Sequence, residues 1–150
     1  MKMNSLFENK ADYSLNESFN VPGIEEHGVG DVIKQSLIEI MRFHVFHWNA
    51  KSYSKHQAVG EFYEKLNELV DELAEKYVGA GGAIDGIIAA SINIDRLDEA
   101  RVRASLKNLR RTVANSIDST GSDSRLMSVN DSLVQILNLI DHTEYKCDLM

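Results

Sequence analysis

Proline is almost absent from this chain, and that absence constrains its fold more than any other sequence feature. The single proline is Pro22, and none follows it up to residue 150. A proline inside a helix removes a backbone hydrogen bond and collides with the preceding turn, so its absence permits long helices. Apolar residues recur at intervals of three and four, the period of one helical face. The pattern predicts four long helices, at about residues 31–48, 56–78, 97–118 and 125–146.

The first helix is expected to begin at Asp31, whose carboxylate can cap free N–H groups of the first turn. Its predicted core face is a stripe of residues at helical spacing: Ile33, Leu37, Ile40, Met41, His44 and Trp48. Phe43, Val45 and Phe46 lie off that stripe, so the end of the helix is apolar on nearly every side. This predicts a second buried contact for the first helix, beyond its own bundle.

The order of the predicted helices defines the expected fold class. Residues 83–95 fit a short apolar helix within a longer connection. Two long helices, this connection and two more long helices predict an all-α, ferritin-like four-helix bundle, with a long crossover between the second and third helices. The bundle is expected to occupy residues 31–150, and the polar residues 1–30 are expected to form a flexible N-terminal arm.

Composition narrows the classes of function. With 150 residues, 43% of them hydrophobic, the chain can bury one good core. Cys147 is alone, so no disulfide can form within the chain, and the reducing cytoplasm is the expected location. We expect no secretory signal and no membrane span, since no run of about 18 apolar residues is present. The net charge of −7 disfavours DNA as a partner, because binding to phosphates depends on positive charge.

Side chains that bind metal ions concentrate in one part of the chain: His44, His47, His56, Asp71 and Glu75. This mixture of imidazoles and carboxylates suits iron or zinc and is too rich in nitrogen for magnesium or calcium. His44 and His47 are three residues apart and the two acids are four apart, so each pair shares one helical face. His47, near the end of the first helix, and His56, at the start of the second, can approach each other across the turn.

The length of the second helix separates the histidines from the acids. From His56 to Asp71 the chain advances fifteen residues, roughly 22 Å at 1.5 Å per residue of helix. One chain cannot bring both groups to the same ion without breaking the helix. Two copies packed antiparallel about a two-fold axis would join the histidines of one copy to Asp71 and Glu75 of the other, and symmetry would create two such sites.

Three segments around these residues form a recognisable pattern: His47-Trp48-Asn49-Ala50-Lys51, then His56, then Val70-Asp71-Glu72-Leu73-Ala74-Glu75-Lys76. The pattern resembles the ferroxidase motif of Dps proteins, the mini-ferritins of bacteria. The spacings from His56 to Asp71 and from Asp71 to Glu75 match that family residue for residue. The resemblance is close over residues 40–80 and extends to the helix order elsewhere. Small phage-encoded ferritin-like proteins also look similar.

The resemblance implies an iron site shared by two subunits. His47 and His56 would be ligands from one subunit, and Asp71 and Glu75 would come from the partner. The implied function is binding of Fe(II), its oxidation by oxygen or peroxide, and iron storage in a hollow shell of twelve subunits, with protection from peroxide. Trp48 would lie beside the site, where the equivalent tryptophan of the family is proposed to quench radicals.

The chain departs from the family pattern in two ways near the site, and the first is that the segment between His47 and His56 is about three residues shorter than in typical members. Four residues after His56, where the family has a further carboxylate, this chain has Gly60. Glu64 points toward the same side and is a candidate substitute, and His44 is an additional candidate ligand. A di-iron site, a mononuclear iron site and a zinc site are all compatible with this set of residues.

Each candidate residue also has a plainer interpretation. His44 lies on the predicted core stripe and fits a buried histidine better than a ligand. Asp71 and Glu75 also fit an ordinary solvated face, and Trp48 fits packing better than redox chemistry. The sequence predicts an iron-binding, Dps-like ferroxidase. The alternatives are a non-catalytic metal-binding or DNA-protective relative, and a structural helical bundle that keeps the motif as packing.

Overall fold

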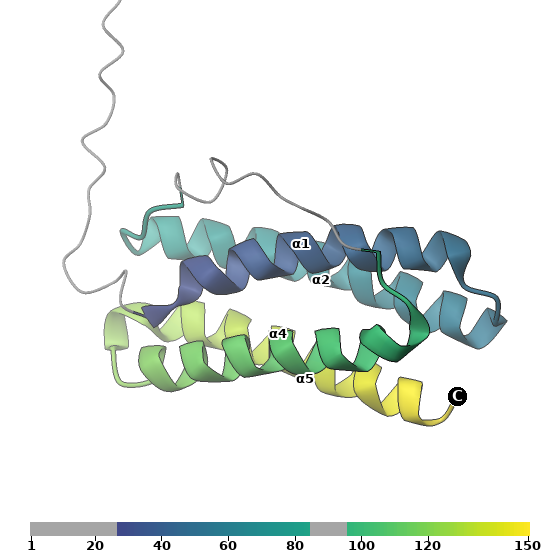
Figure 1. The fold of residues 1–150 in the computed structure, drawn as a ribbon. Helices are drawn as coiled ribbons and strands as arrows, with labels where there is room; N and C mark the ends of the chain where they lie inside the picture. Colours follow the sequence, from purple (N-terminus) through teal and green to yellow (C-terminus); the bar gives the residue numbers. More distant parts are fainter. Residues whose placement is uncertain (1–26, 85–95) are drawn as a thin grey trace, which may run out of the picture.

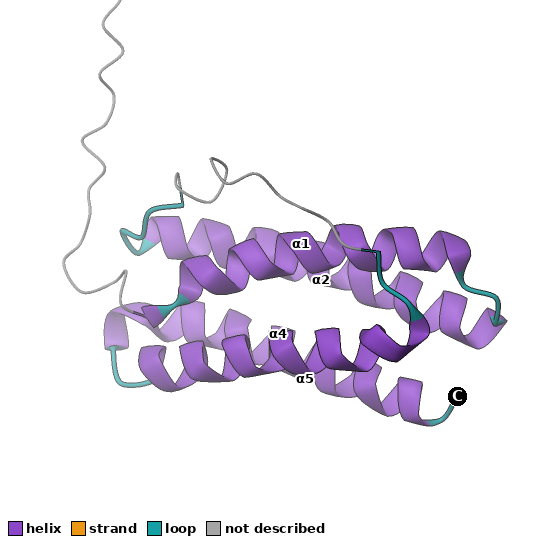
Figure 2. Ribbon diagram, viewed as in Figure 1, coloured by secondary structure: helices purple, strands orange, loops and turns teal. Residues whose placement is uncertain are grey.

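The computed structural model describes residues 27–84 and 96–150. Within them lie four long helices and one turn of 3₁₀ helix: α1 (Val29–Asn49), α2 (Tyr53–Gly79), α4 (Glu99–Thr120), η2 (Ser124–Leu126) and α5 (Met127–Asp148). The described ranges contain no strand (Figure 2). None of the described helices is both long and apolar enough to cross a membrane. The prediction of an all-α four-helix bundle is confirmed.

Each of the four long helices packs against two neighbours (Figure 1). α1 lies on α2 and α4, and α5 lies on the same two helices. α2 and α4 run in the same direction, because α2 ends and α4 begins at opposite ends of the bundle. One long connection between two such helices is the topology of ferritin-like bundles. The short helix predicted within residues 83–95 and the arm predicted for residues 1–30 fall almost entirely outside the described residues.

Local side-chain caps begin two of the helices. Ser52 caps α2 by accepting a hydrogen bond from the backbone N–H of Lys55, and Asp98 caps α4 in the same way. The expectation that Asp31 caps the first helix is wrong. The N-cap of α1 is Gly28, in a left-handed conformation, and no side chain makes a capping hydrogen bond there. Asp31 lies inside the first turn, where its negative charge interacts favourably with the helix dipole.

The core is built from one face of each helix. On α2, α4 and α5 its buried side chains follow the spacing that the sequence predicts. They are Val59, Phe62, Leu66, Leu69, Val70, Leu73 and Tyr77 of α2, Val102, Leu106, Leu109 and Val113 of α4, and Val129, Leu133, Ile136 and Ile140 of α5. Burying one large apolar side chain contributes about 1.5–3 kcal/mol relative to leaving it exposed. These three rows are therefore a main source of the stability of the bundle.

On α1 the predicted core face is right at its start, where Ile33 is buried, and wrong farther along the helix. Met41 and Trp48, assigned to the core stripe, are 47% and 67% exposed. Phe43 and Phe46, assigned to the other side, are 0% and 7% exposed. The true inner face also contains Glu39, which is buried. Because an acid interrupts the apolar pattern of that face, the sequence favours a neighbouring stripe, which turns outward at Met41 and Trp48.

Glu39 is buried between α1 and α4, where two side chains donate hydrogen bonds to its carboxylate. Ser105 Oγ donates to Glu39 Oε2 at 2.5 Å, and Arg42 Nη1 donates to Glu39 Oε1 at 2.8 Å. Arg42 Nη1 also donates to Ser105 Oγ at 3.1 Å. A carboxylate inside a protein is costly unless it is paired and hydrogen-bonded. These partners stabilise the face of α1 that packs toward α4.

Close packing just beyond α2 leads to a stability prediction. A Cβ added to Gly82 would meet ring atoms Cε2 and Cζ of Tyr77 at 2.4 Å. Because Tyr77 is buried, Gly82→Ala is expected to lower the free energy of unfolding by about 1–3 kcal/mol. Gly79→Ala is the matched control, since nothing lies within 4 Å of its added Cβ. Urea unfolding of both variants tests the prediction, and equal midpoints would contradict it.

Candidate metal centre

Two histidines meet where α1 passes into α2. His47 lies in the last turn of α1, and His56 lies in the first turn of α2. Their rings stack, with centroids 3.7 Å apart and planes that differ by 24°. The short connection between the helices thus brings together the two imidazoles that the sequence analysis expected to approach each other.

Reciprocal hydrogen bonds determine which nitrogen of each ring carries the proton. His47 Nδ1 lies 2.8 Å from the backbone oxygen of His56, and His56 Nδ1 lies 3.0 Å from the backbone oxygen of His47. A carbonyl oxygen only accepts, so both Nδ1 atoms must donate, and in the neutral form of each ring Nε2 keeps a lone pair. Metal-binding histidines are commonly held in this way, with one ring nitrogen donating to a carbonyl and the other facing the ion.

The ring of His47 occupies the space left by a glycine. A Cβ added to Gly60 would lie 3.0 Å from Cε1 and 3.1 Å from Nδ1 of His47. Gly60 is buried in the middle of α2, where glycine is unfavourable by about 0.5–1 kcal/mol relative to alanine. The absence of a side chain at this position therefore lets the imidazole lie against α2.

The imidazole pair continues into a row of aromatic rings. Tyr63 meets His47 edge-on, with centroids 5.5 Å apart. On its other side, Tyr63 stacks on His44 at 4.3 Å, and His44 contacts Trp48 at 4.5 Å. Burial, and after it the neighbouring Glu64, raise the pKa of Tyr63 above its usual value. Tyr63 is therefore a neutral phenol at pH 7, and His44 packs between two aromatic rings.

The acids proposed as ligands lie apart from this pair in the single chain. His56, Asp71 and Glu75 all belong to α2, which is continuous from Tyr53 to Gly79. Asp71, Glu75 and Glu64 are exposed. The part of the chain that the structure describes contains no group of three or more His, Cys, Asp or Glu side chains that could hold a metal ion. One chain alone thus supplies two imidazoles without a carboxylate.

Sequence reasoning missed the roles of two residues near the histidines. Tyr63 was assigned to the core face of its helix, but it is only half-buried and links His44 to His47. Gly60 was noted only for the carboxylate that it lacks, whereas its main effect is to make room for a ring. The available signal was a glycine inside a long helix, one turn after His56.

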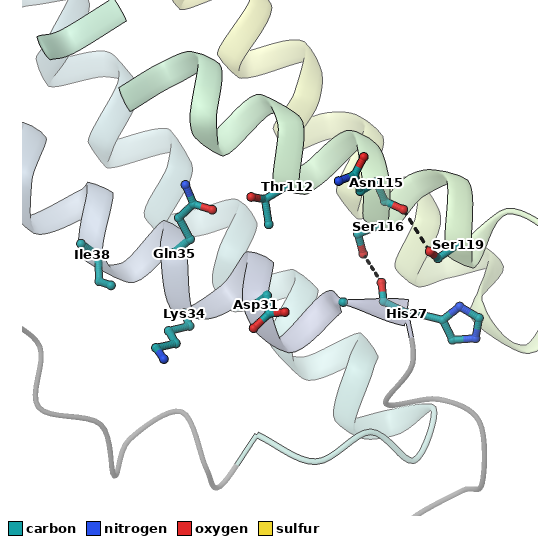
Figure 3. A pocket seen from close by; sticks show the side chains of 10 residues that line it. His27, Asp31, Lys34, Gln35, Ile38, Thr112, Asn115, Ser116 and Ser119 are labelled. Atoms are coloured by element: carbon teal, nitrogen blue, oxygen red, sulfur yellow. Dashed lines mark hydrogen bonds between the residues drawn. The ribbon is translucent and has the colours of Figure 1, made fainter. Parts of the chain in front are cut away.

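A polar groove of about 530 Å³ lies between α1 and α4, away from the histidine pair (Figure 3). The hydroxyl groups of its two serines already donate hydrogen bonds to backbone oxygens. Ser116 Oγ donates to the backbone oxygen of His27 at 2.8 Å, and Ser119 Oγ donates to that of Asn115 at 3.0 Å. The groove is lined by polar side chains but contains no pair of imidazoles, and we place the candidate metal site at the histidines.

The fold and the site together define a class: an all-α four-helix bundle with a pair of imidazoles at the junction of its first two helices. The chain belongs to a family of unknown function, DUF5856, whose family model matches residues 47–147. The matched range begins at His47 and includes His56, Asp71 and Glu75.

A curated relative is the DNA protection during starvation protein of Helicobacter pylori (strain J99 / ATCC 700824). The two sequences are 31% identical over 67 residues, which cover 43% of this chain and 46% of that protein. The chain thus matches about half the length of this relative. No solved structure matches the chain. The helical bundle and this partial match fit a Dps-like or ferritin-like relative.

Proposed function

We propose that the protein binds Fe(II) between two copies of the chain and oxidises it with oxygen or peroxide, for iron storage and protection from peroxide in the cytoplasm. His47 and His56 of one copy would bind the ion together with Asp71 and Glu75 of the other. The observation that carries the proposal is the pair of open Nε2 atoms, one on each stacked ring, with both Nδ1 atoms held by backbone oxygens.

The separation of the histidine and the two acids along α2 supports a site shared by two chains. His56 lies near the first residue of α2, whereas Asp71 and Glu75 lie in its last third. Because these acids are exposed, a partner can reach them without unfolding the bundle. An antiparallel partner would bring its own α2 alongside in the opposite direction, so that its acids lie near the histidines of the first copy.

An outward face of α1 supports the same arrangement. Leu37, Met41, His44 and Trp48 follow one another at helical spacing, and Met41 and Trp48 are the most exposed of them. At one end, Leu37 borders a largely apolar groove of about 360 Å³ that Asp71 also lines. At the other end, His44 and Trp48 join the ring cluster beside His47. This apolar face is suited to burial against a second copy and connects the two halves of the proposed site.

The set of donors suits iron. Two imidazoles and two carboxylates favour a first-row transition ion, and carboxylates stabilise Fe(III) relative to Fe(II). In the proposed reaction the imidazoles would orient Fe(II), and the carboxylates would hold it while an electron passes from Fe(II) to oxygen or peroxide, which an open position would admit. Trp48 lies in the ring cluster, next to the site rather than in it, where it would intercept reactive by-products. Zinc is the competing ion for the same donors.

DNA is disfavoured as a partner of this chain, although a relative is named for DNA protection. Three arginines of α4 are paired with acids: Arg101 with Asp98, Arg103 with Asp148, and Arg110 with Asp141. The net charge of −7 adds repulsion from phosphates.

A structural role is the second candidate function. The two hydrogen bonds between the histidines and the backbone already join α1 to α2 without a metal ion. If this is their whole purpose, the protein is a helical bundle that keeps the motif as packing.

Anaerobic Fe(II) titration followed by addition of oxygen or peroxide separates the two candidates. Wild type is expected to bind Fe(II) saturably and to form ferric iron faster than buffer alone. Asp71→Ala/Glu75→Ala is expected to lose both properties while keeping its helical circular dichroism, because both side chains are exposed. Glu68→Ala, which removes an exposed acid of the same helix, is the control and should behave as wild type. Wild-type oxidation no faster than buffer, without saturable binding, would favour the structural role.

A further inference from the structure

We propose that Gly60 is a positioning residue for His47 and that it makes each shared site mononuclear. The inference rests on the proposed metal site and states how many ions that site holds and which residue determines the number.

The contact between Gly60 and His47 is on the side of the ring that makes the hydrogen bond. The nearest atoms to an added Cβ are Cε1 at 3.0 Å and Nδ1 at 3.1 Å, whereas Nε2 is 4.0 Å away. A side chain at this position would therefore push on the edge that carries the Nδ1 proton. The ring would have to shift by a few tenths of an ångström, against its hydrogen bond to the backbone oxygen of His56 and its stacking on the second ring.

The same missing side chain removes the nearest place for a third donor. Gly60 lies one turn after His56 on the same helix and faces the ring of His47. The acids that follow do not fill the gap in the described chain. Glu61 accepts a hydrogen bond from Lys146, which lowers the pKa of Glu61 and keeps it charged in an ion pair. Glu64 lies one turn farther along α2 and adjoins Tyr63, and the nearest atoms in the space beside Gly60 all belong to His47.

The count of donors then limits the number of ions. One shared site would contain two imidazoles from one copy and two carboxylates from the other. Four protein ligands are enough for one first-row ion and leave room for an oxidant in six-coordinate geometry. Di-iron bundles surround their two ions with glutamates from four helices and two histidines, a larger set than this site has. The donors also favour Co(II), Zn(II) and Fe(II) over Mg(II), which prefers oxygen.

The test of stoichiometry uses Co(II) with the full chain, under anaerobic conditions. Isothermal titration and the visible absorption of bound Co(II) are expected to saturate at about one ion per chain, because a two-fold dimer has two equivalent sites. Saturation at two ions per chain would overturn the mononuclear inference and leave the proposed function intact. An absence of saturable binding would instead overturn the proposed function, and the inference with it.

The test of the positioning role compares Gly60→Ala with Gly30→Ala, whose added Cβ meets nothing within 4 Å. In metal-free wild type, ¹⁵N NMR of the imidazoles is expected to show both rings protonated at Nδ1. Gly60→Ala should change the His47 signals and raise the Kd for Co(II) on the order of tenfold or more, as loss of an orienting contact does. Gly30→Ala should change neither. Unchanged His47 signals and Kd in Gly60→Ala would overturn the positioning role.

A second substitution keeps this test informative if Gly60→Ala unfolds. Adding His47→Ala removes the ring that the new Cβ would meet, so the double variant is expected to recover the helical circular dichroism and melting temperature that Gly60→Ala loses. A double variant as unstable as Gly60→Ala would show that the ring is not what the glycine accommodates, and would overturn the inference.

Discussion

Mixing two inactive variants, His47→Ala and Asp71→Ala, is expected to restore metal binding. Each variant alone should lose saturable Fe(II) binding, because each of its shared sites lacks one ligand. When the two are unfolded together and refolded, about half of the dimers should be mixed, and each mixed dimer has one intact site of its two. The expected capacity is therefore about a quarter of that of wild type, measured by anaerobic Fe(II) titration.

The mixture has a built-in control. A blend of His47→Ala with His56→Ala should remain inactive, because both substitutions remove ligands from the same half of the site and no pairing can complete it. Recovery in that blend, or none in the first while dimers form normally, would show that the histidines and the acids do not meet across two chains.

Glu39→Ala is expected to destabilise the bundle more than any surface substitution. Removing one partner of a buried charged pair costs about 3–5 kcal/mol. Here the substitution leaves Ser105 Oγ without its carboxylate acceptor and removes the carboxylate to which Arg42 Nη1 donates. We expect a loss of about 3 kcal/mol in the free energy of unfolding, and a melting temperature lower by roughly 10 °C for a chain of this size. Urea and thermal unfolding measure both quantities.

Two further variants show whether burial is the cause. Glu68→Ala removes an exposed acid whose partner Lys65 is also exposed, and it should change stability by less than about 0.5 kcal/mol. Replacing the whole group by Glu39→Leu with Arg42→Met and Ser105→Ala should recover much of the loss, since apolar side chains of similar size often stabilise as well as a buried pair does. A loss below about 1 kcal/mol for Glu39→Ala would contradict the assignment of Glu39 to a dry interior.

The elements of this fold differ in how well their sequence predicts them. The inner face of α2 is apolar without interruption from Val59 to Tyr77, so periodicity alone identifies it. The inner face of α1 contains Glu39, and its outer face has Met41 and Trp48. Periodicity does not show that Glu39 can be buried, because its hydrogen-bond partner Ser105 comes from another helix, α4.

The candidate site also has some features that the sequence predicts and others that depend on the tertiary structure. The spacing of His56, Asp71 and Glu75 on a helix free of proline means that one ion bound by all three would need two chains, since backbone geometry fixes the rise per residue. The stacking of His47 on His56, the proton on each Nδ1 and the use of Gly60 depend on how the end of α1 meets the start of α2.

The sequence by itself determined the four helices, their order and the separation of histidines from acids. These follow from hydrogen bonding and side-chain spacing within each segment, which are local properties of the chain. Only the tertiary structure decided which face of α1 is buried, which imidazole nitrogens stay open, and why a glycine interrupts α2. Those outcomes depend on contacts between residues far apart in sequence or on different helices, where one polar partner or one missing side chain outweighs the local pattern.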